Sequence, residues 1–244
     1  MYLSQDIYCW IPALAKYKTQ PGTNLPPDKI KLGFGHHYPR LIMVQSVFRK
    51  LISRVTFNWF VINPIFNYCM RPLFIWRHSL YPDRDLRSVD YQEKGGKLKY
   101  WSRELPSALE IVAEIAVFLL VEEVGFYYTH LALHSPALYA RVHKIHHEWS
   151  APLGLTSLYA HPLEHALSNL LPVALGPLLV GSHLVTAWAW YSLSLVSTIN
   201  AHSGYHLPFF FSPEFHDYHH LKFNQCFGVI GLLDYLHGTD IKFR

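Results

Sequence analysis

Histidines are the residues of this chain whose number and spacing point to chemistry. The 244 residues include 17 histidines, as many as aspartate and glutamate together, and thirteen lie between positions 130 and 220. All of these thirteen except His183 have another histidine three or four residues away, a spacing that shares one face of a helix and lets imidazoles bind one metal ion. The groups are His130 and His134; His143, His146 and His147; His161 and His165; His202 and His206; and His216, His219 and His220.

The grouping favours a metal site over ordinary burial. A single buried histidine is most often a hydrogen-bonded core residue, and this is our interpretation of His183 and His237. A cluster of neutral imidazoles without a partner would leave several buried polar groups unpaired, at a cost of about 1–3 kcal/mol each. A metal ion would satisfy them together.

The donor atoms restrict the metal. Cys9, Cys69 and Cys226 lie far apart in the sequence and predict neither a disulfide framework nor a thiolate site. Imidazole ligands suit zinc, copper, iron or nickel. A structural zinc needs only four ligands, whereas at least ten histidines are available, so we expect two ions. Two such ions with open positions suggest oxygen chemistry with non-haem iron, although spacing alone does not separate iron from zinc.

Hydrophobic residues make up 50% of the chain and charged residues 16%, which excludes a disordered chain. The net charge of +4 comes without a dense basic run, so we expect no nucleic-acid partner. Residues 41–75, 107–128 and 166–201 are apolar and long enough to cross a membrane. Residues 166–201 contain no aspartate, glutamate, lysine or arginine. These segments predict an all-α, polytopic membrane protein with about four transmembrane helices; a soluble helical protein is the alternative.

The metal hypothesis constrains the topology. Pro172, Gly176, Pro177 and Gly181 suggest a break within residues 166–201, which would make this segment a hairpin of two helices. A hairpin returns the chain to the same side of the membrane, so all histidine groups can meet in one helical cap. We expect residues 1–40 to be an irregular N-terminal segment, residues 76–104 to be a polar connector, and residues 41–244 to be one membrane-embedded domain with its histidine boxes in residues 130–220.

The histidine strings resemble those of the fatty acid hydroxylase superfamily, which includes sterol desaturases and C-4 methylsterol oxidases. The superfamily's boxes HxxxH, HxxHH, HxxxH and HxxHH match the first, second, fourth and fifth groups in order. The longer strings EEVGFYYTH, HSGYHLPF and EFHDYHHLKFNQCFGVIGLLDYLHGTD are also similar, over roughly residues 41–243. One departure is Leu131, where the family commonly has arginine. The resemblance is strongest to relatives of the methylsterol oxidases.

The resemblance implies a non-haem di-iron oxygenase of the endoplasmic reticulum membrane. It would hydroxylate a C–H bond of a sterol or related lipid with O2, and the metal site would face the cytosol. Electrons would come from NAD(P)H through a reductase and a haem b cytochrome. These would be partner proteins, because the chain itself has no dinucleotide-binding GxGxxG string. The implied ligands are the ten box histidines; we expect no catalytic residue beyond them and no other cofactor site. The HPLEH string makes His161, Glu164 and His165 possible additional ligands or hydrogen-bond partners of ligands.

Two alternatives remain open at this point. The substrate could be a fatty acyl chain or a sphingolipid rather than a sterol. The protein could also be a metal-binding membrane regulator without oxygenase activity. A zinc transporter is a weaker alternative, since we would expect carboxylate-containing ligand sets within its spans.

Overall fold

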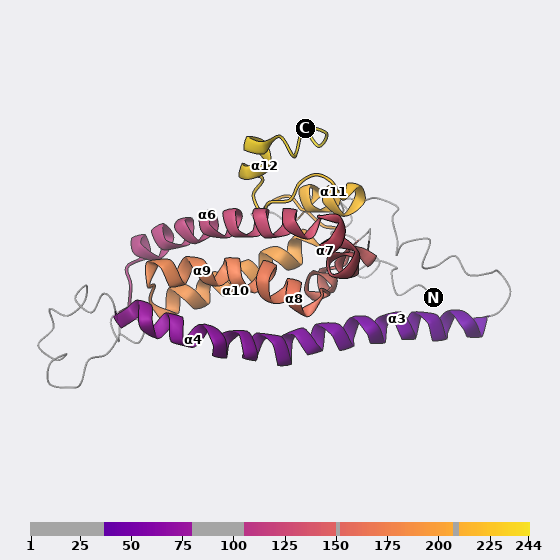
Figure 1. Cartoon of the computed structure of the whole chain (residues 1–244), viewed down its shortest axis with the longest axis horizontal. Helices are drawn as coiled ribbons and strands as arrows, with labels where there is room; N and C mark the ends of the chain where they lie inside the picture. Colours follow the sequence, from indigo (N-terminus) through magenta and orange to yellow (C-terminus); the bar gives the residue numbers. More distant parts are fainter. Residues whose placement is uncertain (1–36, 80–104, 150–151, 207–209) are drawn as a thin grey trace, which may run out of the picture.

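The computed structural model describes residues 37–79, 105–149, 152–206 and 210–244. These residues form helices and turns without a β-strand, as the all-α prediction requires. Figure 1 shows a long helical rod along one side of the molecule, a bundle of helices against it, and short helices at one end. The irregular segment and the connector expected from the sequence lie mostly in residues 1–36 and 80–104, outside the described residues.

The rod consists of α3 (His37–Phe57), the π-helical turn η2 (Asn58–Ile62) and α4 (Asn63–Ser79). Residues 41–75 are therefore helical, as predicted. The rod is longer than expected, because residues 37–40, assigned to the irregular segment, and residues 76–79, assigned to the connector, are also helical. These polar ends continue the helix because helix hydrogen bonding does not require apolar side chains.

The second element is α6 (Ala108–Leu133), whose 26 residues extend for about 39 Å at about 1.5 Å per residue. Ser107 and Glu110 form a capping box at its start. Close packing holds α6 against α9 (Leu171–Val180), since a Cβ atom added at Gly176 would lie 2.8 Å from Phe118. Glycine is needed at this crossing because a larger residue would push the helices apart.

Residues 166–201 form the two helices predicted for them. The short helix α8 (Pro162–Glu164) and the π-helical turn η7 (His165–Leu170) lead into α9, and α10 (Leu184–Ala201) follows a turn at Gly181. Gly181 has a φ of 70°, a left-handed conformation that ends a helix with least strain when the residue is glycine. The indole of Trp190 donates to the Val173 carbonyl at 2.9 Å and joins the two helices.

Each π-helical turn ends two residues before a proline. Pro64 and Pro172 have no backbone N–H, and the ring of a proline displaces the carbonyl four residues earlier. Those carbonyls belong to Phe60 in η2 and Ser168 in η7. A wider turn accommodates the displaced carbonyl while the helix continues.

The short helices form a cap over one end of the bundle and the adjoining side of α6, above which α12 lies (Figure 1). They are α7 (Pro136–Arg141), the 3-10 helices η5 (His143–Glu148) and η6 (Gly154–Leu158), α11 (Glu214–Lys222) and α12 (Leu232–His237). The cap is joined to α6 through Glu123, which is fully buried. Its carboxylate accepts hydrogen bonds from the backbone N–H groups of Val229, Ile230 and Leu233 at 2.7–3.0 Å.

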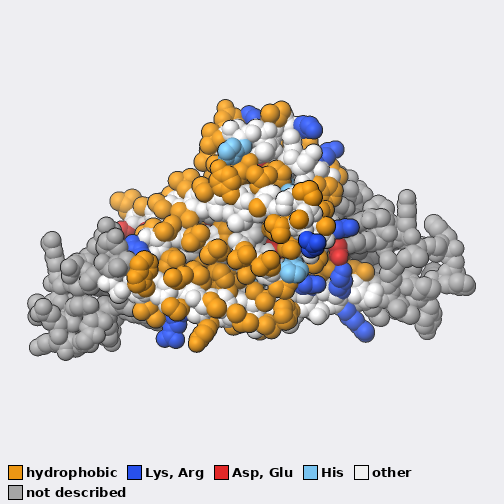
Figure 2. All heavy atoms as spheres, viewed as in Figure 1, with side chains coloured by type: hydrophobic (Ala, Val, Ile, Leu, Met, Phe, Trp, Pro, Cys, Tyr) orange, Lys and Arg blue, Asp and Glu red, His pale blue; other side chains and the backbone are white. Residues whose placement is uncertain are grey.

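By length and composition, one helical segment in the described part of the chain, Pro162–Val180, could cross a membrane, with a mean hydropathy of 1.3. The four-span arrangement stays a prediction. Figure 2 shows apolar side chains over much of the middle of the bundle, with lysine and arginine side chains nearer its ends. The exposed apolar residues include Phe60, Tyr68, Leu109 and Trp188. Apolar surface of this extent is typical of a face that contacts lipid or another protein.

Replacing Glu123 should destabilise the attachment of the cap. Glu123→Gln puts an amide N–H2 where a carboxylate oxygen accepts a backbone N–H, so at least one charge-assisted hydrogen bond is lost. We expect a loss of about 1.5–3 kcal/mol in the free energy of unfolding, measured by denaturant titration of the detergent-solubilised protein. The matched control is Glu110→Gln, because glutamine also completes a capping box; equal stabilities of the two variants would contradict the prediction.

Candidate metal centre

Nine histidines converge where α6 and α10 end. His130 lies in the last turn of α6, while His134 and His202 cap the C-termini of α6 and α10. The remaining six come from η5 and α11. Their donor nitrogens form two groups, each within 4.8 Å: a five-histidine group of His130, His134, His143, His147 and His219, and a four-histidine group of His146, His202, His216 and His220.

The two HxxHH boxes each contribute to both groups. In η5, His143 and His147 join the five-histidine group and His146 joins the other. In α11 the assignment is reversed, since His216 and His220 join the four-histidine group and His219 joins the other. Positions i and i+4 thus face one group, and position i+3 faces the second.

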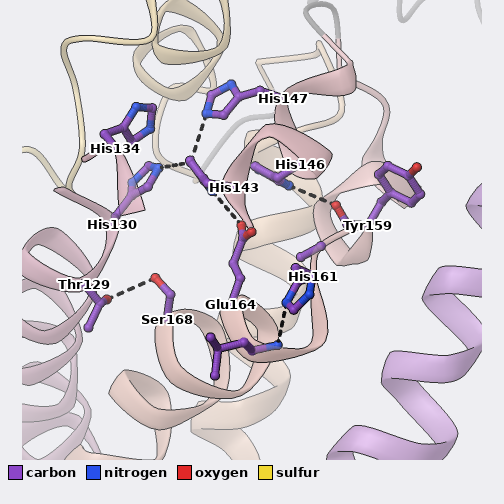
Figure 3. Close-up of polar contacts among 12 residues, drawn as sticks. Thr129, His130, His134, His143, His146, His147, Tyr159, His161, Glu164 and Ser168 are labelled. Atoms are coloured by element: carbon purple, nitrogen blue, oxygen red, sulfur yellow. Dashed lines mark hydrogen bonds and ion pairs between the residues drawn. The ribbon is translucent and has the colours of Figure 1, made fainter. Parts of the chain in front are cut away.

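Six of the nine imidazoles have a fixed oxygen acceptor at Nδ1. A backbone carbonyl cannot donate, so the Nδ1 atom facing one carries the proton and Nε2 of the neutral ring carries a lone pair. Figure 3 shows two of these contacts, from His143 to Glu164 and from His146 to the Tyr159 carbonyl. The Nδ1 contacts are His130 to Phe227 O, 2.8 Å; His143 to Glu164 Oε1, 2.8 Å; His146 to Tyr159 O, 3.3 Å; His202 to Thr198 O, 2.8 Å; His219 to Gln225 O, 2.7 Å; and His220 to Trp149 O, 3.0 Å.

The same rings face one another through Nε2. The Nε2 atoms of His130 and His143 are 3.1 Å apart, and those of His146 and His202 are 3.2 Å apart. When Nδ1 of both partners carries the proton, two lone pairs meet and no hydrogen bond can form between them. A cation between the nitrogens removes this repulsion. The donor set therefore fits a metal ion in each group.

The other Nε2 separations agree with shared coordination. In the five-histidine group His143–His147 and His147–His219 are 3.0 and 3.1 Å apart, and in the four-histidine group His202–His216 and His216–His220 are 3.0 and 3.1 Å apart. At a metal–nitrogen distance of about 2.1 Å, ligand nitrogens at 90° are about 3.0 Å apart and at a tetrahedral angle about 3.4 Å apart. The separations match ligands at angles near 90°.

Burial keeps these imidazoles neutral, as metal ligands must be. Desolvation lowers the pKa of His146 to about 4 and, together with the nearby His146 imidazole, the pKa of His202 to about 3. Desolvation also lowers the pKa of His147 and His220. Lone pairs at the site are thus available at neutral pH.

His206 is the box histidine that the structure leaves outside both groups. Its side chain is exposed, while His202 of the same box is buried. The spacing predicts both side chains on one helical face, but α10 ends at Ala201 and Gly204 turns the backbone with a φ of 74°. The rule that residues four apart share a face therefore does not apply to this pair.

The HPLEH residues lie beside the metal centre rather than in it. Glu164 is buried and accepts from Nδ1 of His143, which fixes the orientation of that ring. His161 accepts from the Leu163 backbone N–H and caps α8 (Figure 3), and His165 pairs with Asn63 at 2.7 Å. All three are outside the two groups.

Sequence reasoning missed the partners of Glu148, which lies next to the site. Lys50 of α3 forms an ion pair with Glu148 at 2.8 Å, and the Tyr159 hydroxyl donates to the same carboxylate at 2.8 Å. The Tyr159 carbonyl in turn accepts from His146. These contacts tie the long rod to the four-histidine group. The only signal in the sequence is that Glu148 follows directly after His147.

An apolar cavity of about 780 Å³ leads to the metal centre. Its wall includes His130, His143 and His146, together with His202 and His216. Away from the histidines it is lined largely by aromatic and aliphatic side chains of α4, α6, α9 and α10, among them Phe66, Met70, Phe126 and Trp190. A cavity of this size and lining is typical of a site for a small apolar ligand.

Comparison with known proteins gives a consistent result. The profile of the family described as "Fatty acid hydroxylase" matches residues 115–239. Fatty acid hydroxylase domain-containing protein 2 of Homo sapiens is 46% identical over 237 residues, which are 95% of this chain and 59% of that protein. Methylsterol monooxygenase 2-2 of Arabidopsis thaliana is 40% identical over 243 residues, 95% of this chain and 76% of that protein.

A further relative, Fatty acid hydroxylase ahd1 of Mycosarcoma maydis, is 36% identical over 231 residues, covering 95% of this chain and 51% of that protein. The chain thus spans between about half and three fifths of the length of the human and fungal relatives. No solved structure matches this chain.

Removing the carboxylate behind His143 should weaken metal binding. Glu164→Gln keeps an oxygen near His143 Nδ1 but loses the negative charge that makes this ligand more basic. Changes of this kind typically lower metal affinity about 10–100-fold. Competition with a chelator, read as metal content per chain, measures the effect. Glu214→Gln, which alters an exposed carboxylate of α11, is the matched control, and equal metal retention in both variants would contradict the prediction.

The metal-depleted protein should lose stability as the pH falls below about 6.5. Unfolded histidine has a pKa near 6.5, whereas the folded pKa values are about 4 for His146 and about 3 for His202. Between these values the unfolded state binds more protons, so stability rises with pH. Each group contributes up to about 1.4 kcal/mol per pH unit, down to pH 4 and pH 3 respectively. Denaturant titrations at several pH values measure the slope; a flat profile from pH 6.5 to 4.5 would contradict it.

Proposed function

The chain belongs to the fatty acid hydroxylase family, and on this basis we propose that it is a membrane-bound di-iron oxygenase acting on a sterol or related lipid. The reaction is RH + O2 + 2 e⁻ + 2 H⁺ → ROH + H2O. A C–H bond of the lipid is oxidised to C–OH, and the second oxygen atom is reduced to water. A methylsterol is the first candidate substrate, because one relative is named a methylsterol monooxygenase.

The observation that carries the proposal is that one apolar cavity is bordered by histidines of both groups. His130 and His143 represent the five-histidine group in its wall, and His146, His202 and His216 the four-histidine group. A C–H bond of a lipid in this cavity would lie next to both candidate metal positions. Oxidation of an unactivated C–H bond requires this proximity and the exclusion of bulk water.

Each part of the chain then has a role. The nine histidines would hold the metal through Nε2, and the acceptors at Nδ1 fix the direction of six of the rings. Bound iron would supply the activation of O2, a redox chemistry that zinc lacks. The aromatic residues of the cavity would orient the lipid and exclude water from the reacting carbon.

The location follows from the same proposal. The rod of α3 and α4, helix α6, and helices α9 and α10 would be the four membrane-crossing elements, and the exposed apolar side chains of the bundle would face lipid. The metal centre would face the cytosol from the endoplasmic reticulum membrane. Electrons would come from NAD(P)H through a reductase and a haem b cytochrome, for which the cytosolic side offers access.

The experiment below also tests two other functions. Hydroxylation of a fatty acyl chain or sphingolipid is favoured by relatives whose names refer to fatty acid hydroxylases. A regulator that binds metal without oxidising a substrate would keep the histidine groups but would not need the apolar cavity that they border.

Replacing a histidine that borders the cavity tests the proposal. His146→Ala removes a nitrogen of the four-histidine group, so we expect lipid hydroxylation to fall at least about 100-fold, the upper end of losses seen even for changes behind the ligands. Lipid profiles of cells that lack the endogenous protein and express each variant measure the change, with metal analysis of the purified proteins. Lys222→Ala, at an exposed position of α11, is the control.

The outcomes separate the alternatives. Accumulation of 4-methylsterols in cells with His146→Ala supports the sterol reaction. Accumulation of unhydroxylated acyl or sphingoid lipids supports hydroxylation of a fatty acyl chain or sphingolipid. Unchanged lipid profiles, or stoichiometric zinc in protein purified under iron-replete conditions, would argue for the regulator.

A further inference from the structure

One carboxyl group in the cavity wall has no role in the fold. Ile115, Leu119, Glu122, Phe126 and His130 of α6 all line the cavity and share one face of the helix. Glu122 is the acidic residue of this face, whose other residues are apolar apart from His130. It accepts no hydrogen bond from any described residue.

Its neighbour shows the contrast. Glu123 faces away from the cavity and its carboxylate accepts three backbone hydrogen bonds from the cap. Glu122 has no such partner, and neither lysine nor arginine is found among the described residues that line the cavity. A half-buried carboxyl group in a largely apolar wall is costly without a partner. Its position on the wall of the cavity points to a ligand that supplies the missing hydrogen-bond donor.

A second polar side chain lies at the same depth. Ser194 of α10 lines the cavity, and its buried Oγ has no hydrogen-bond partner in the part of the chain that the structure describes. Glu122 is eight residues before His130, and Ser194 is eight residues before His202. Both helices end at the metal centre, so each side chain is about 12 Å from it along its own helix. Two different helices thus put an unpartnered polar group at one level.

We propose that Glu122 and Ser194 form a subsite for a hydroxyl group of the lipid substrate, about 12 Å from the carbon that is oxidised. A hydroxyl can donate to the Glu122 carboxyl group and accept from the Ser194 hydroxyl at the same time. The proposal rests on the proposed lipid hydroxylation, for which it names a class of substrate: lipids with a hydroxyl group remote from the site of attack.

The subsite discriminates between the candidate substrates. In a 4-methylsterol the hydroxyl is on the carbon next to the one that carries the methyl group. With that methyl group at the metal centre, the hydroxyl would also lie there and would leave Glu122 and Ser194 unfilled. A long-chain lipid oxidised far from its hydroxyl would fill both positions. The subsite therefore favours the long-chain alternative.

The subsite is tested with two probes, one of which has a hydroxyl group as a hydrogen-bond donor while the other has a methyl ether in its place. We use 1-hexadecanol and 1-methoxyhexadecane, and we measure thermal stabilisation of the detergent-solubilised full chain against probe concentration, which gives apparent affinities by mass action. The wild type should bind the alcohol about 3–10-fold more tightly than the ether, the range of one intramolecular hydrogen bond. Equal affinities would overturn the proposal and would mean that only water occupies the position.

The variants separate the subsite from a general effect on the cavity. Glu122→Leu should abolish the preference for the alcohol, Glu122→Gln should retain most of it because an acceptor oxygen remains, and Ser194→Ala should reduce it. Leu119→Val, on the same face of α6, should alter the affinities for both probes by the same factor. A preference that persists in both Glu122→Leu and Ser194→Ala would overturn the proposal.

The measurement needs no turnover. A protein that prefers the alcohol but oxidises no lipid would overturn the proposed function and leave the subsite standing. A protein that hydroxylates lipids but binds the two probes equally would overturn the subsite alone.

Discussion

An imidazole that donates from one nitrogen has only a lone pair left on the other, and the cap of this protein is built on that constraint. Carbonyls of Tyr159, Thr198 and Phe227 and the carboxylate of Glu164 each accept from a histidine Nδ1. The opposite nitrogens then face inward as lone pairs about 3 Å apart. Packing alone cannot stabilise such an arrangement. Cations at the two groups would remove this repulsion, so the cap, the helix ends and the histidine wall of the cavity fit a metal site.

The bundle supplies the rigid part of this arrangement. Helices α6 and α10 both end at the histidines, so their last turns fix His130, His134 and His202 relative to the cavity. The cap contributes the other ligands on short helices, which are held to the bundle by Glu123 and to the rod by Lys50 and Glu148. Polar contacts of buried or half-buried side chains thus determine where an otherwise apolar bundle places its histidine groups.

The sequence was most informative where chemistry depends on local spacing. The i, i+3 and i+4 pattern was sufficient to predict a metal centre, and the absence of charges in residues 166–201 with Gly181 near the middle was sufficient to predict the hairpin. The position of His206 was not predictable in this way, because the end of α10 and the left-handed Gly204 break the helical spacing. The pairing of Glu164 with His143 depends on tertiary structure, as does the difference between Glu122 and Glu123, two adjacent glutamates on different faces of one helix.

The exchange of histidines between the two HxxHH boxes has a consequence for how this centre can evolve. Each histidine group contains residues of both HxxHH boxes. His146 joins the group of His216 and His220, and His219 joins the group of His143 and His147. Neither HxxHH box can be deleted without removing ligands from both histidine groups. A descendant that loses an HxxHH box therefore loses ligands from both groups, whereas one that loses an HxxxH box keeps one group intact.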